Sequence, residues 1–98
     1  MEKAEIIKRI NEIAEPIRSR GATALFIYGS RARGDARPDS DLDVFVDYEP
    51  GTGFSLLDLA GIERMLAEHL GLEVHATTRS SFGPYMRAEA DRDAIRVF

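Results

Sequence analysis

Two short segments with strand-forming sequences, residues 24–28 and 42–47, lie close together in the chain and restrict the folds open to it. Both are rich in aromatic and branched apolar residues and are bounded by glycine or charged residues, which favours buried β-strands. The polar stretch between them, residues 29–40, contains Gly34 and Pro38 and predicts a loop with room for one helical turn. A connection this short predicts that the two strands are antiparallel neighbours.

Helical periodicity flanks these strands on both sides. Isoleucines recur with helical spacing near the N-terminus and predict an amphipathic helix over residues 2–19, in which Pro16 should kink or break the last turn. A leucine stripe between Ser55 and Gly71 predicts a second helix. Ser55 and Asp58 form a variant of the capping box at its start.

The C-terminal third completes a mixed sheet. Residues 72–77 predict a third strand, which the long helix joins to the second strand by a right-handed parallel crossover. Pro84 opens a last short helix, and residues 95–98 form a terminal strand or a docked tail. The order α-β-β-α-β-α predicts an α/β (α+β) fold, a small mixed β-sheet flanked by helices. The length of 98 residues fits one domain, 1–98.

Composition and charge argue against several classes of protein. A hydrophobic content of 44% fits a folded core, and no apolar run approaches the roughly 20 residues that a membrane span needs. The chain has no cysteine and no signal-peptide-like start, so we expect a cytoplasmic protein without disulfides. The net charge of -4 argues against a stand-alone nucleic-acid binder, although Arg31, Arg33 and Arg37 form a local basic cluster.

Two polar motifs at the strand ends are the candidates for chemistry. Gly29 and Ser30 follow the first strand, whereas Asp41 and Asp43 open the second, so antiparallel pairing would bring the two motifs to one cleft. Strand alternation places both carboxylates on one face, roughly 7 Å apart at the backbone, while the apolar residues between and after them face the core. Such an oxygen-rich pair suits Mg²⁺, with Mn²⁺ as a substitute.

The glycine-serine corner has the features of a phosphate-binding loop. Gly29 would let a phosphate approach the backbone, and the amides and hydroxyl from Ser30 onward would donate to phosphate oxygens. Arg31 and Arg33 would balance the charge of a nucleoside triphosphate. The structural alternatives are a solvated acidic pair, a serine-capped strand-to-helix turn and surface arginines.

These two motifs together resemble the signature of the DNA polymerase β-like nucleotidyltransferase superfamily. The signature here is Gly29-Ser30, then ten residues, then Asp41-Leu42-Asp43. The longer motif formed by residues 28–34 and 40–44 is similar to that of the minimal nucleotidyltransferases of this superfamily, the MntA-like proteins. The resemblance implies the polymerase β-like fold and transfer of a nucleoside monophosphate, commonly AMP from ATP, to an acceptor. It also implies an antitoxin role beside a HEPN-type toxin. A chain this short has little room for an acceptor domain, so we expect the acceptor to be such a partner.

One position departs from the family pattern. Where the family carries a third aspartate as ligand and general base, this chain has His75, with Glu73 two residues earlier on the same strand face. An imidazole can act as a base near neutral pH, but it is a poorer Mg²⁺ ligand than a carboxylate. The implied catalytic set is therefore Asp41, Asp43 and His75, with Glu73 as the substitute for His75 if the register differs by two. A catalytically impaired antitoxin that acts by binding, or a nucleotide sensor, remains the alternative.

Overall fold

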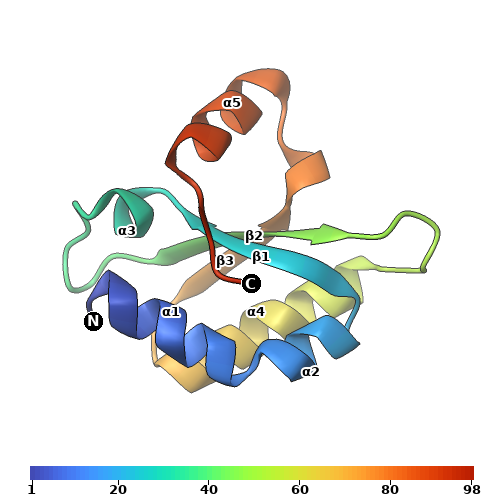
Figure 1. The fold of residues 1–98 in the computed structure, drawn as a ribbon, viewed down its shortest axis with the longest axis horizontal. Helices are drawn as coiled ribbons and strands as arrows, with labels where there is room; N and C mark the ends of the chain where they lie inside the picture. Colours follow the sequence, from blue (N-terminus) through green and yellow to red (C-terminus); the bar gives the residue numbers. More distant parts are fainter.

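The computed structural model describes residues 1–98 as a four-stranded mixed sheet with helices on both faces (Figure 1). The strand order is β3-β2-β1-β4, with β1 antiparallel to β2 and β4, and β2 parallel to β3. This arrangement confirms the predicted fold class. The elements are α1 (Lys3–Glu12), α2 (Ala14–Ser19), β1 (Ala22–Tyr28), α3 (Ser30–Arg33), β2 (Leu42–Tyr48), α4 (Leu56–Leu70), β3 (Val74–Thr78), η1 (Arg79–Ser81), α5 (Pro84–Asp93) and β4 (Ile95–Arg96).

The main hydrophobic core lies between one face of the sheet and α1, α2 and α4, which share that side in Figure 1. Strand alternation supplies the sheet's half of this core, because every second residue of β2 points to the helices. As predicted, the apolar residues that alternate with the aspartates are fully buried. The side chains with no more than 1% exposure in this core are Ile6, Ile10, Ile17, Leu25, Ile27, Leu42, Val44, Val46, Ile62 and Leu66.

Aromatic side chains cover the middle of the opposite face. The rings of Phe26 and Phe45 stack with their centroids 4.8 Å apart, and Phe82 meets Phe45 edge-on at 5.6 Å. Arg79 lies over the rings of Phe26 and Phe45, 4.8 and 4.9 Å from their centroids, and its Nε donates to Asp47 at 2.8 Å. Because Asp43 precedes Phe45 by two residues on the same face, the sheet carries its acidic pair just beyond this aromatic cluster.

The N-terminal helix is broken earlier than the sequence predicts. The helical pattern stops at Ile13, whose φ and ψ of −116° and 23° separate α1 from α2. Pro16 lies three residues further on, in the first turn of α2. Its ring would clash with the carbonyl of Glu12 in a continuous helix, and in a first turn its missing N–H removes no hydrogen bond. The predicted break is therefore confirmed, but it lies one turn upstream of the proline.

The two edges of the sheet are formed by β4 and β3. The C-terminal residues predicted as a strand or tail form β4 on β1, and the Leu25 N–H donates to the Phe98 carbonyl at 3.0 Å. At the other edge, the Ala76 N–H of β3 donates to the Glu63 carboxylate of α4 at 2.8 Å, which satisfies an edge amide that could otherwise pair with another chain.

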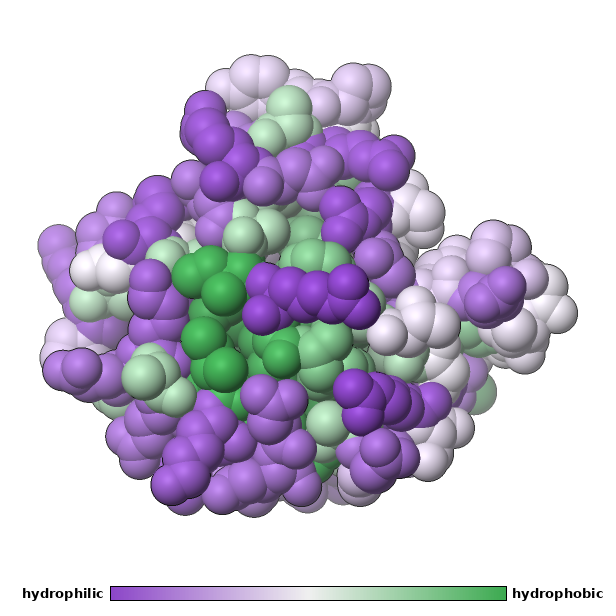
Figure 2. Space-filling model, viewed as in Figure 1, coloured by the Kyte–Doolittle hydropathy of each residue, from purple (hydrophilic) through white to green (hydrophobic).

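On the surface shown in Figure 2, hydrophilic side chains surround a hydrophobic centre. None of the helices has the length and apolarity required to span a membrane.

Candidate functional site

The end of β1 and the start of β2 meet where the sequence predicts a shared cleft. Tyr28 lies opposite Asp43 in the antiparallel register, so Gly29 turns the chain directly beside that carboxylate. A Cβ atom added to Gly29 would lie 2.8 Å from Oδ2 of Asp43. Gly29 also has φ of 75° and ψ of −154°, a backbone region that is open essentially to glycine alone. Glycine at this corner is therefore what allows the backbone to approach the carboxylate.

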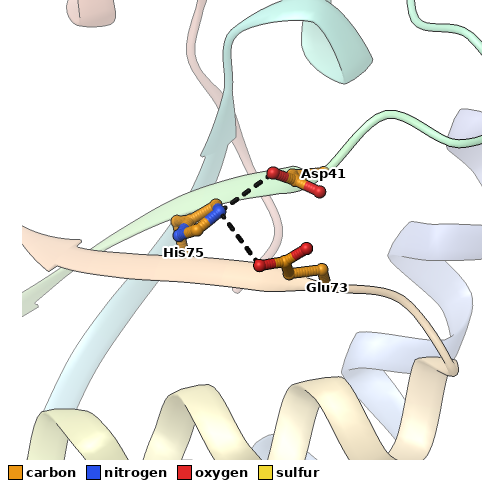
Figure 3. A group of neighbouring side chains, drawn as sticks. All are labelled: Asp41, Glu73 and His75. Carbon is orange, nitrogen blue, oxygen red and sulfur yellow. Dashed lines mark hydrogen bonds and ion pairs between the residues drawn. The ribbon is translucent and has the colours of Figure 1, made fainter.

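The parallel pairing of β2 and β3 adds two further side chains. His75 lies opposite Asp43 in this register, and Glu73 directly precedes β3. The His75 Nε2 lies 2.9 Å from Oδ2 of Asp41 and 3.8 Å from Oε1 of Glu73, and in Figure 3 the ring edge faces both carboxylates. The ligand atoms of Asp41, Glu73 and His75 all lie within 4.8 Å of one another and could hold a metal ion.

At the start of β2 and β3, Asp43 and His75 have shifted pKa values, and the carboxylates have no basic side chain as an ion-pair partner apart from His75. Burial raises the pKa of the Asp43 carboxyl, and Asp41 raises it further, whereas His75 and Arg33 lower it. The hydrogen bond to Asp41 is the main cause of a raised pKa at His75. None of the ion pairs joins Asp41, Asp43 or Glu73 to a lysine or arginine. The site therefore carries excess negative charge that a cation would balance.

The predicted helical turn after the corner is α3. The Gly29 carbonyl accepts hydrogen bonds from the Ala32 and Arg33 amides at 3.1 and 3.0 Å, which closes the turn with Ser30 as its first residue. Arg33 is exposed and pairs with Asp35 at 3.1 Å and with Asp93 of α5 at 3.4 Å. Its hydrogen bond to Asp35 is the main cause of a raised pKa at Arg33. The charge of this guanidinium is close enough to Asp43 to lower the pKa of that carboxyl.

Arg31 occupies a different environment from Arg33. Its side chain is buried, with only 5% of the residue exposed. The guanidinium donates twice to the Ser40 carbonyl, at 2.7 and 3.2 Å, and also to the carbonyls of Pro38 and Met1. Arg31 therefore fastens the loop that leads into Asp41, whereas the sequence suggested it as a phosphate contact.

We expect Arg31→Met to lower the free energy of unfolding by about 2 kcal/mol or more, because the loop carbonyls would lose charged donors in a buried position. Arg37→Met is the matched control, since Arg37 is exposed in the same loop and its side chain makes no hydrogen bond or ion pair. Thermal and urea unfolding of both variants measure the difference. Equal stability of the two variants would contradict the structural role of Arg31.

A small cleft beside Gly29 was not predicted from the sequence. Its volume is about 130 Å³, and it lies between the end of β1, α3 and α5. Tyr28 lines one side, and Met86 and Ala90 of α5 line the other. Burial, followed by the charge of Asp43, raises the pKa of the Tyr28 phenol, which therefore stays protonated and can donate a hydrogen bond. For the α5 side of the cleft, the sequence indicated only that a helix begins at Pro84. It did not indicate where that helix would pack.

Comparison with known proteins gives a consistent assignment. The family model described as "Nucleotidyltransferase domain" matches residues 5–97. The protein adenylyltransferase MntA of Thermococcus cleftensis is 39% identical over 77 residues, which cover 79% of this chain and 76% of that protein. A solved structure described as a minimal nucleotidyltransferase is 34% identical, with a TM-score of 0.83 and coverage of 97% of this chain and 95% of the other.

A more distant structure shares the fold. It is the complex of the tri-AMPylated HEPN toxin of Shewanella oneidensis with its MNT antitoxin, in which one chain matches at 14% identity with a TM-score of 0.66. The match covers 92% of this chain and 69% of that chain. Because the family match and the solved minimal relative both extend over nearly the whole sequence, the chain belongs to the nucleotidyltransferase family, among its minimal members.

Proposed function

We propose that the chain transfers AMP from ATP to a side chain of a partner protein. The observation that carries this proposal is the approach of the Gly29 corner to Asp43, which joins a phosphate-binding turn to a carboxylate pair at one strand end. Phosphoryl-type transfer depends mostly on positioning and on charge stabilisation, and these residues can supply both. The Thermococcus relative, which bears the name protein adenylyltransferase, supports the choice of AMP and of a protein acceptor.

The donor set at this strand end fits a divalent cation. Asp43 is half-buried with a raised pKa, and no arginine or lysine pairs with it or with Asp41. Two carboxylates next to a phosphate site are the ligands that Mg²⁺ accepts most readily, and Mn²⁺ can replace it. Asp41 and Asp43 would hold the ion, which when bound polarises phosphate oxygens and offsets their charge.

The remaining residues bind and orient the nucleotide. Gly29 admits the triphosphate to the backbone, and the Ser30 hydroxyl donates to it. Arg33 is the exposed guanidinium beside Asp43 and balances the triphosphate charge. We assign Arg31 to positioning, because its guanidinium already donates to three carbonyls of the neighbouring backbone. The cleft between Tyr28 and α5 is large enough for only part of the nucleotide.

His75 is the residue placed to receive the acceptor's proton. Its side chain is 55% exposed, and Asp41 orients the ring through Nε2. A raised pKa leaves more of the imidazole protonated near neutral pH, and a protonated ring cannot accept a proton. A smaller fraction of His75 is therefore in the unprotonated form that can accept the acceptor's proton.

A HEPN-type toxin is the proposed acceptor, and the chain would act as its antitoxin. The support is the shared fold with the chain in the complex of the AMPylated Shewanella toxin. The test is incubation of the protein with labelled ATP, Mg²⁺ or Mn²⁺, and a candidate HEPN-type toxin. We expect metal-dependent labelling of the toxin that a chelator abolishes. If the label stays on ATP with either metal, the transferase proposal fails.

A second candidate function, a binding antitoxin with impaired catalysis, is favoured by the raised pKa of His75, which leaves less unprotonated imidazole to act as a general base. We expect His75→Asp to raise Mg²⁺-dependent transfer by about tenfold or more, because it supplies a third carboxylate opposite Asp43. Initial rates of toxin labelling measure this change. A fall in the rate would instead assign the base role to His75. Neutralisation of the toxin that persists when Asp41 and Asp43 are both replaced by alanine would favour the binding antitoxin.

A further inference from the structure

We propose that Asp41, Glu73 and His75 form a binding site for a divalent first-row transition-metal cation, with Zn²⁺ bound more tightly than Mn²⁺ and both more tightly than Mg²⁺. This inference rests on the proposed function, because Asp41 also belongs to the carboxylate pair assigned to the nucleotide-bound ion. It deepens that function by naming the cation that this particular chain selects.

The three side chains already approach the spacing of ligands around one ion. The His75 Nε2 lies 2.9 Å from Asp41 Oδ2 and 3.8 Å from Glu73 Oε1, and all three ligand atoms lie within 4.8 Å of one another. Two ligand atoms that are each about 2.1 Å from a shared ion can be at most about 4.2 Å apart. Small side-chain rotations therefore suffice, and the exposed fractions of 43%, 55% and 70% for Asp41, His75 and Glu73 leave room for them.

The backbone that presents these side chains is held firmly. The Leu42 N–H donates to the Glu73 carbonyl at 2.9 Å, so the first residue of β2 is joined directly to the residue that precedes β3. His75 lies opposite Asp43 in the parallel register. Because β2 and β3 are paired at this point, metal binding would mainly order the three side chains, which limits the entropy that it would cost.

The charge around the three residues is unbalanced. Asp41 and Glu73 form ion pairs only with His75, which is charged only when protonated. By contrast Asp47, further along the same face of β2, is neutralised by Arg79 at 2.8 Å. The sheet thus provides a guanidinium for Asp47 and none for Asp41 or Glu73, whose negative charge a bound cation would offset.

The imidazole of His75 determines which divalent cation the three-residue site prefers. Mg²⁺ prefers oxygen ligands and retains its waters, so a nitrogen ligand contributes little to its binding. Imidazole binds transition metals well, and affinity at such mixed sites rises from Mn²⁺ towards Zn²⁺. One nitrogen, two carboxylates and an open side for solvent or phosphate form a three-ligand site of the kind that Zn²⁺ occupies in enzymes.

The test is calorimetric titration of the nucleotide-free protein with Zn²⁺, Mn²⁺ and Mg²⁺ separately. We expect Zn²⁺ to bind most tightly, and His75→Ala to weaken Zn²⁺ binding by at least about tenfold with a much smaller effect on Mg²⁺. His69→Ala is the matched control, because His69 also pairs with a carboxylate, Glu12 at 2.9 Å, but belongs to no three-ligand cluster. A rise in melting temperature with Zn²⁺ that is lost in His75→Ala gives an independent readout.

Three results would overturn the inference: equal Zn²⁺ affinity in His75→Ala, an equal loss in His69→Ala, or Mg²⁺ binding as tight as that of Zn²⁺. The titration contains neither ATP nor an acceptor, so it is independent of the transfer assay. Transfer with Mg²⁺ but without Zn²⁺ preference would refute this inference alone. Zn²⁺ binding through His75 without any transfer would refute the proposed function alone.

Discussion

Replacing Asp43 with asparagine is expected to reduce AMP transfer at least about a hundredfold while leaving the stability of the fold unchanged or slightly higher. Loss of a metal-ligating charge removes several kcal/mol of transition-state stabilisation, and each 1.4 kcal/mol or so corresponds to a tenfold change in rate. Because burial and Asp41 raise the Asp43 pKa, its ionised form disfavours the folded state, and the neutral amide relieves that cost. Toxin labelling and thermal unfolding near neutral pH measure the two effects.

Asp47→Asn is the control for this variant, because Asp47 lies on the same face of β2 but is paired with Arg79 at 2.8 Å. It should lose up to about 1 kcal/mol of stability, as expected for a partly exposed ion pair, and keep its transfer rate. A result in which Asp47→Asn impairs transfer as strongly as Asp43→Asn would remove the special role of the acidic pair.

The second large effect is expected from Gly29→Ala, which should both destabilise the fold by about 2 kcal/mol and abolish detectable transfer. The backbone of Gly29 lies in a region that costs other residues about 1–3 kcal/mol. The added methyl would also meet Oδ2 of Asp43 at 2.8 Å and force the carboxylate or the turn to move. Chemical denaturation and the labelling assay test the two parts of this expectation.

Gly34→Ala separates the backbone effect from the contact with Asp43. Gly34 also has a positive φ of 85°, yet a Cβ added there meets nothing within 4 Å. This variant should lose about 1 kcal/mol of stability and retain transfer. If Gly34→Ala and Gly29→Ala reduce transfer equally, the close approach of Gly29 to Asp43 has no functional importance.

Much of the acidic strand end could be predicted because its cause is local. Alternation along β2 fixes Asp41 and Asp43 on the face opposite the buried Leu42 and Val44, and it depends only on the pleat of a strand. A short connection then determines the antiparallel pairing that brings Gly29 to Asp43. Both inferences use nearest-neighbour geometry, so one sequence is enough to support them.

The residues that sequence analysis placed less well depend on contacts between distant parts of the chain. Arg31 is buried because the carbonyls of Met1, Pro38 and Ser40 converge on it, and no local pattern distinguishes it from the exposed Arg33. The packing of α5 beside Tyr28 is similar, because the helix has little amphipathic character and buries only Ala90. Such side chains are assigned by tertiary structure alone.

The edge position of β3 has a consequence for how this chemistry can change over evolutionary time. His75 extends from a strand with a neighbour on one side only, and its exposed side chain makes no contribution to the buried core. If His75 has the roles proposed above, exchanging it would alter ion binding and proton transfer at the strand end without disturbing the scaffold. A lineage could therefore drift between catalysis and simple binding through substitutions at one surface position, while the same protein continues to fold.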